Sequence, residues 1–135
     1  MSAATKLADP IAPSNWPQEL KAELQRNQLN GHVGSQLVSE TDRVRVWLIA
    51  LKPGERLPLH RHVLDYFWTA TSPGKARSHS LTGETNEWSY AVGDTKHMCF
   101  PAGQSMIHDL ENIGDTLLTF TTVELKESAN TPLAL

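Results

Sequence analysis

The spacing of apolar residues changes near residue 30, and the stretch before it has the period of a helix. Its largest apolar side chains recur every four positions, at Trp16, Leu20 and Leu24. Residues four apart lie on one face of an α-helix, so this spacing predicts an amphipathic helix. Ser14 or Asn15 is placed to cap its N-terminus. The apolar stripe has to pack against either the rest of the chain or a partner subunit.

From residue 31 onward the pattern is that of short strands. Segments rich in valine, leucine, threonine and aromatic residues are separated by Pro-Gly, Gly-Glu, Gly-Asp and Gly-Gln pairs, which are typical of turns. We expect strands over residues 32–38, 43–51, 60–71, 76–81, 87–92, 95–100, 105–111 and 116–124. Many short strands with frequent turns favour a sandwich or barrel, so the expected fold class is all-β with one N-terminal helix.

The length of 135 residues is typical of one domain with one core. Pro10 and Pro13 interrupt the first residues, which are therefore expected to form an irregular segment that leads into the helix. We divide the chain into an N-terminal arm and helix, residues 1–30, and a β-barrel domain, residues 31–135. No internal repeat or low-complexity linker divides the second part.

Composition and charge narrow the range of partners. The chain has 12 Lys and Arg against 15 Asp and Glu, a formal net charge of −3, whereas a nucleic-acid surface needs clustered basic residues. No stretch approaches the ~18 apolar residues of a membrane span, and the first residues lack the pattern of a secretory signal. Cys99 is the single cysteine, so no intrachain disulfide can form. We expect a cytoplasmic protein without nucleic-acid or membrane partners.

The candidate chemistry begins at a His-x-His pair. Successive side chains of a strand point to opposite faces, so His60 and His62 share one face and Arg61 points to the other. Two imidazoles two residues apart on the same face of a strand can coordinate one metal ion, provided that a third ligand comes from elsewhere in the chain. The alternative is a pair of solvated histidines on the surface.

The residues around this pair and a later group form two spaced motifs. The first reads Gly54-x5-His60-x-His62-x3-Tyr66-x7-Gly74, and the second reads Gly93-x7-Pro101-x-Gly103-x4-His108-x3-Asn112. In this order they resemble the two motifs of the cupin superfamily, over about residues 43–124. The resemblance implies a cupin barrel, that is, a double-stranded β-helix or jelly roll, in which His60, His62 and His108 are metal ligands.

The chain departs from the family pattern at one ligand. Where the family usually has a glutamate, this sequence has Tyr66 and Phe67. Strand alternation places on one face His60, His62, Leu64, Tyr66 and Trp68. Asp65 falls on the other face, so it does not replace the missing carboxylate unless a bulge shifts the register. The site is therefore expected to be a three-histidine site.

Three neutral ligands leave a divalent cation its full charge and open positions for substrate or water. Such open coordination is typical of catalytic rather than structural sites. Iron(II), zinc, nickel and manganese are the candidate ions, and the sequence does not choose among them.

The remaining candidates each have a second interpretation. Tyr66 is either a catalytic proton donor or a core aromatic residue. Four apolar residues either line a substrate cavity or simply fill the barrel: Trp68, Met98, Phe100 and Met106. His97 falls on the face opposite its apolar neighbours and is treated as a non-ligand. Arg45 and Arg77 either anchor a carboxylate or are solvated.

These expectations support two functions of different classes. The first is an iron(II)-type oxygenase acting on a small polar metabolite, because some cupin oxygenases that cleave dicarbonyl or thiol substrates are similar in using three histidines. The second is a non-catalytic module that binds a metal or small molecule. A metal-free, epimerase-like cupin needs a histidine oriented by a carboxylate, and none is identifiable. The chain also resembles short stand-alone cupins placed near β-alanine catabolism, and such barrels resemble homodimers.

Overall fold

Between residues 6 and 135, the part of the chain that the computed structural model describes, the sequence forms one helix and nine strands. Residues 1–5 of the expected arm lie outside the described residues. No helix in the described part is long and apolar enough to cross a bilayer. The elements are α1 (Gln18–Asn27), β1 (Gln36–Glu40), β2 (Val44–Leu51), β3 (Arg56–His62), β4 (Asp65–Ala70), β5 (Gly74–His79), β6 (Thr85–Tyr90), β7 (Thr95–Met98), β8 (Met106–Asn112) and β9 (Leu118–Leu125).

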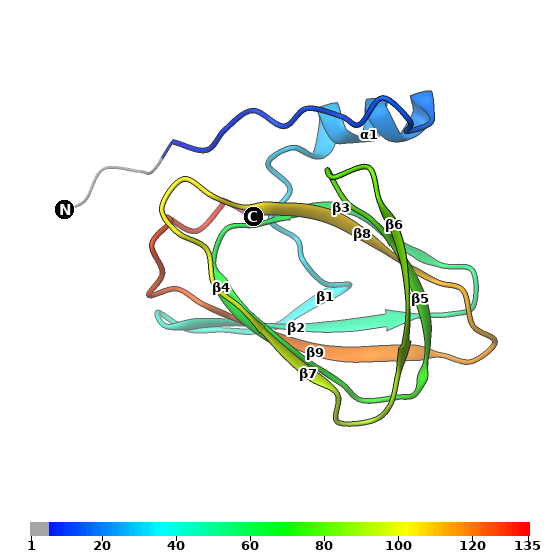
Figure 1. Cartoon of the computed structure of the whole chain (residues 1–135). Coiled ribbons are helices and arrows are strands. Elements are labelled where there is room, and N and C mark those ends of the chain that lie inside the picture. The colour runs from blue at the N-terminus through cyan, green and yellow to red at the C-terminus, as the bar shows by residue number, and fades with distance from the viewer. Residues whose placement is uncertain (1–5) are drawn as a thin grey trace.

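The strands form two antiparallel sheets that face each other (Figure 1). The strand orders are β1-β2-β9-β4-β7 and β3-β8-β5-β6. Burial alternates along β2 and β9, as expected for strands with one face on a core. The core between the sheets contains Ile49, Leu51, Leu57, Ala70, Ala76, Leu118 and Phe120. The predicted all-β class with one N-terminal helix is confirmed.

The strand predicted over residues 60–71 is two strands in different sheets. β3 ends at His62 in the four-stranded sheet, and β4 begins at Asp65 in the five-stranded sheet. The chain crosses between them at Val63 and Leu64, which are 2% and 0% exposed. The prediction was wrong because this corner is apolar and holds neither glycine nor proline, so it carries no turn signal.

A β-bulge decides which residues of β3 face the barrel interior. The paired positions on either side of it are Leu57 with Leu110 and His60 with His108. β3 therefore has one residue more than β8 between these pairs, and Pro58, which has no N–H for the ladder, lies in the extra step. The bulge shifts the alternation so that His60 and His62 point inward after it.

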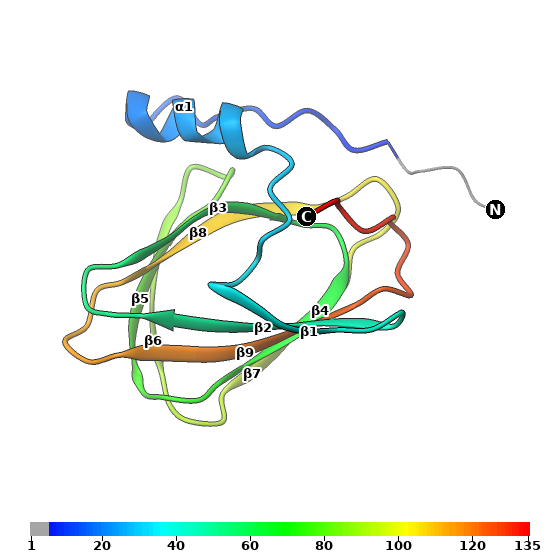
Figure 2. The same ribbon diagram turned by 180° about the vertical axis from the view of Figure 1, so that it is seen from behind.

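Helix α1 packs on the outer face of the four-stranded sheet (Figures 1 and 2). Its stripe belongs to a second apolar cluster made of Trp16, Leu20, Leu24, Leu59 and Ile107. The stripe is thus buried within its own chain rather than left for a partner subunit. The predicted cap was wrong: the helix starts after Pro17 without a side-chain cap, and Asn15 instead donates to the carbonyl of Gly83 at 3.0 Å.

A charged network fastens α1 to the sheet. Arg56 donates from Nε to Asp109 Oδ2 at 2.7 Å and from Nη1 to Glu23 Oε1 at 2.8 Å. Asp109 is 0% exposed, and it also accepts the backbone N–H of His79 at 2.6 Å. Because Asp109 directly follows His108, the network also holds the β8 backbone at the predicted ligand.

Arg61 ties the segments that flank the helix to the back of β3. Its guanidinium donates to the carbonyls of Ala8, at 2.6 Å, and Gln28, at 3.1 Å. It is 4% exposed and is satisfied by neutral acceptors. The predicted orientation is confirmed: Arg61 points away from the face that carries His60 and His62.

Candidate metal centre

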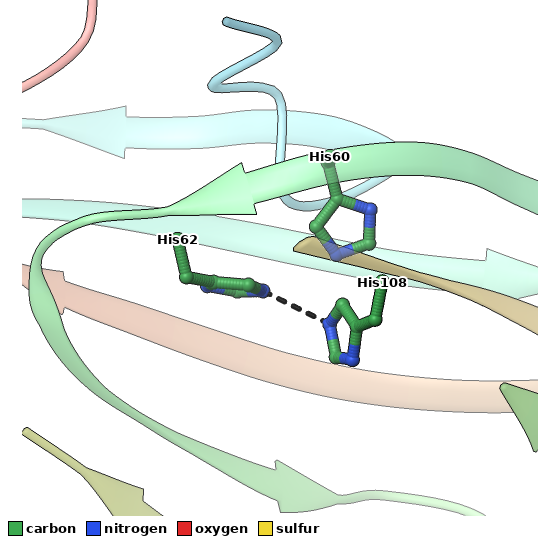
Figure 3. A group of neighbouring side chains, drawn as sticks. All are labelled: His60, His62 and His108. Carbon is green, nitrogen blue, oxygen red and sulfur yellow. Dashed lines mark hydrogen bonds between the residues drawn. The ribbon is translucent and has the colours of Figure 1, made fainter. Parts of the chain in front are cut away.

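Three histidine side chains meet inside the barrel (Figure 3). His60 and His62 come from β3, and His108 comes from the adjacent strand β8, where it lies opposite His60. Their candidate ligand nitrogens all lie within 4.8 Å of one another, and the Nε2 atoms of His62 and His108 are 3.1 Å apart. The trio predicted from the sequence is therefore brought together at a spacing that suits one cation.

The environment keeps the three rings neutral. Burial lowers the pKa of His60 to about 4. Burial and the neighbouring imidazoles hold the pKa values of His62 and His108 well below their ordinary value. Neutral imidazoles are the form that binds metal ions, so near pH 7 no proton has to be displaced from a charged ring.

One ring is oriented by the backbone. His60 Nδ1 lies 2.8 Å from the carbonyl oxygen of Pro58, which can only accept, so Nδ1 carries the hydrogen and Nε2 presents its lone pair to the trio. His62 Nδ1 is buried and has no hydrogen-bond partner among residues 6–135. The Nε2 atoms of His62 and His108 are close together, so at most one of them carries a hydrogen when both rings are neutral. This donor set fits a divalent cation, and the three histidines would hold it.

Tyr66 lies against the site from the other sheet. Its ring stacks on His62, with centroids 4.1 Å apart and planes 14° apart, and Phe100 lies behind it at 6.2 Å. Burial, with a smaller contribution from Glu124, raises the pKa of the Tyr66 hydroxyl, which therefore stays protonated. Tyr66 can donate a proton or a hydrogen bond, but it is a poor base.

Two neighbouring cavities adjoin the histidines, and some residues line both. The inner one, of about 60 Å³, is lined by all three histidines and by apolar side chains. The outer one, of about 490 Å³, shares Tyr66, Trp68 and His108 with it. Met98 and Met106 line the outer cavity only, whereas Phe100 lines neither. Three of the four residues predicted to face a substrate thus reach the cavity system, and their roles stay predictions.

Glu124 is a buried acid that the sequence analysis missed. It is 3% exposed on β9, lies opposite Tyr66 in the strand register, and accepts a hydrogen bond from Trp47 Nε1 at 2.7 Å. Burial raises the pKa of Glu124 to about 7. The alternation of side chains along the strand predicted over residues 116–124 places Glu124 on the inward face. That alternation was the one signal in the sequence that could have indicated a buried acid here.

Replacing Glu124 by glutamine should change how stability depends on pH. The folded protein binds the proton more tightly than the unfolded chain, so stability falls as pH rises from the ordinary pKa of 4.5 through the folded value of about 7. Glu124→Gln keeps the acceptor for Trp47 and should be more stable than the wild type by about 3 kcal/mol above that window. Urea denaturation between pH 4.5 and 8 measures the difference. The exposed Glu127→Gln is the control, and parallel profiles for wild type and Glu124→Gln would contradict the assignment.

His79 is a second residue whose setting the sequence did not indicate. Its Nδ1 lies 2.9 Å from Asp109 Oδ2, so a histidine oriented by a carboxylate does exist. It lies on the outer face of the sheet, with its ring 6.4 Å from that of Trp16, and it lines neither cavity. It is therefore not placed to act as the base of a metal-free reaction inside the barrel.

Arg45 and Arg77, whose roles the sequence left open, lie outside the two cavities, and so does His97, which was expected to be a non-ligand. Arg45 pairs with Glu40 at 2.9 Å, and Arg77 pairs with Glu87 at 3.1 Å. His97 is exposed and does not belong to the trio.

The fold has counterparts among solved structures, although no protein-family model and no curated protein matches the sequence. A cupin domain from Bordetella pertussis superposes with a TM-score of 0.59 at 24% identity, over 67% of this chain and 90% of its own. A protein with a double-stranded β-helix domain from Klebsiella pneumoniae gives 0.55 at 25% identity, over 74% and 82%. An RmlC-like cupin from Methanocaldococcus jannaschii gives 0.55 at 19% identity, over 67% and 76%. This chain therefore has the double-stranded β-helix fold of the cupin superfamily.

Proposed function

We propose that the protein is a metal-dependent enzyme, of the iron(II) oxygenase type, that acts on a small polar metabolite. The observation that carries the proposal is the convergence of three neutral imidazoles at the inner cavity, one of which, His108, also lines a neighbouring cavity large enough for a metabolite. A divalent ion held by His60, His62 and His108 would polarise a chelating substrate and activate dioxygen.

The surrounding residues have roles that suit such chemistry. Tyr66 supplies a protonated hydroxyl beside His62 and keeps that ring in place by stacking. Trp68 packs edge-on against Tyr90 and Phe120, at 5.4 Å from each, and this aromatic wall limits water at the inner end.

A non-catalytic binding module is the second candidate. It is favoured by the composition of the site, because no acidic side chain of the described residues joins the three imidazoles. A site without a carboxylate has no obvious base for proton abstraction, so metal or ligand binding alone is consistent with it.

Several finer expectations remain part of the proposal. A cytoplasmic setting without nucleic acid is supported by the net charge of −3 and by a single, exposed cysteine, Cys99. A homodimer and a link to β-alanine catabolism rest on the resemblance alone.

Metal content and oxygen consumption test the proposal together. Protein stripped with a chelator and reloaded with iron(II), zinc, nickel or manganese is assayed for bound metal and, with 2,4-pentanedione or cysteine, for oxygen uptake. We expect stoichiometric metal in each case, with oxygen uptake by the iron(II) form and none by the zinc form, since zinc has no redox chemistry. Tyr66→Phe, which keeps the stacking on His62, should lower the rate and leave metal content unchanged.

Two results would contradict the oxygenase. Stoichiometric metal without oxygen uptake on any substrate of either class would favour the binding module. Protein that takes up no metal and is unaffected by chelator would exclude both metal-dependent functions.

A further inference from the structure

The outer cavity carries chemical information about its ligand. One histidine of the trio, His108, lines both this cavity and the inner one, and strands of both sheets form its walls. Its aromatic and thioether side chains are Trp68, Trp88, Tyr90, Met98 and Met106. Aromatic and methionine side chains form an apolar, adaptable wall, which suits the carbon skeleton of a small organic molecule.

One cationic side chain faces this cavity. Lys96 on β7 is paired with Trp68 on β4, so both lie on the inward face, and Met98 follows two residues later on the same side. Lys96 lines the outer cavity, and so does His108 of the trio. Within residues 6–135, Lys96 makes no ion pair.

The balance of charge in the cavity favours an anion. Lys96 and Asp94 are the charged side chains among the residues that line it. Asp94 Oδ2 is occupied in its turn, where it accepts the backbone N–H of Ala91 at 2.8 Å. With a dipositive ion on the histidines, the cavity has a net positive charge that a neutral ligand would leave uncompensated.

We propose that the cavity binds a small organic acid whose carboxylate, remote from the metal-binding end, pairs with Lys96. The metal-binding end of this ligand and the net positive charge of the cavity rest on the function proposed above, whereas Lys96 lines the cavity with or without the ion. A single lysine matches one negative charge, whereas a dianionic phosphate group would call for more cationic side chains than the one that lines this cavity. Lys96 thus selects for an acid whose apolar middle spans the space between the ammonium group and the histidine trio.

Matched pairs of 2-oxo acids test the inference. Zinc-loaded protein is titrated calorimetrically with 2-oxopentanedioate and 2-oxohexanedioate, each against the monoacid of the same length, 2-oxopentanoate and 2-oxohexanoate. All four share the chelating end, and the two members of each pair differ only in the remote carboxylate. We expect at least one diacid to bind about tenfold more tightly than its monoacid, as a charge-assisted contact provides. Lys96→Met should abolish that preference, and Lys96→Arg should retain most of it.

Lys75→Met is the matched control, because Lys75 is an exposed lysine that lines neither cavity. It should keep the preference for the diacid. Equal binding of each pair, absence of binding by both diacids, or a preference that survives Lys96→Met would overturn the inference. Bound zinc is measured in every variant. If the protein binds zinc fully but shows no preference for the diacid, only the role of Lys96 is contradicted. If the protein binds no zinc but shows a preference that Lys96→Met removes, only the metal site is contradicted.

Discussion

Replacing His62 by alanine is expected to abolish stoichiometric metal binding while leaving the barrel folded. His62 supplies one of three converging nitrogens, and its Nε2 lies 3.1 Å from that of His108. Two imidazoles without a carboxylate hold a divalent ion weakly, so we expect affinity to fall at least about a hundredfold. Elemental analysis after loading with zinc and dialysis measures the loss, and circular dichroism checks the fold.

The fold should survive this substitution because His62 lines a cavity. Its Nδ1 is buried without a partner among the described residues, so removing the ring also removes an unsatisfied polar atom. His97→Ala is the matched control, since His97 is exposed and lies outside the trio. Unchanged zinc content in His62→Ala, or equal losses in both variants, would rule out His62 as a ligand.

Replacing Arg56 by methionine is expected to lower the free energy of unfolding by roughly 3 kcal/mol. Arg56 bridges Glu23 of α1 and Asp109 of β8, whose side chains are 16% and 0% exposed. Methionine keeps much of the side-chain volume but leaves both carboxylates without their guanidinium. Urea denaturation measures the effect, and faster proteolysis of the N-terminal segment should accompany it.

An exposed arginine on the same sheet provides the comparison. Arg77 pairs with Glu87 at 3.1 Å, with side-chain exposures of 38% and 58%. Exposed ion pairs contribute little, so Arg77→Met should change stability by less than about 1 kcal/mol. Similar losses for Arg56→Met and Arg77→Met would show that the network under α1 does not fasten the helix.

Local patterns predicted much of the architecture. Turn signals and alternation indicated an all-β chain, and the four-residue spacing of Trp16, Leu20 and Leu24 indicated the helix and its buried stripe. The interpretation failed at the corner formed by Val63 and Leu64, where the chain changes sheets without a glycine or proline. The alternation that we followed from His60 to Trp68 crosses this corner and therefore spans two strands instead of one. Tyr66 and Trp68 nevertheless line the cavity, as predicted.

The sequence by itself determined the chemistry of the site: three histidines, no carboxylate in the usual place, and the spacing that brings residues of two segments together. Those properties depend on residue type and on the period of a strand, which are local. The tertiary structure alone decided the rest. The bulge at Pro58 turns His60 inward, and pairing of residues distant in the chain places Glu124 beside Tyr66 and Asp109 against His79. Such contacts depend on how strands pair across sheets, and no local pattern encodes that pairing.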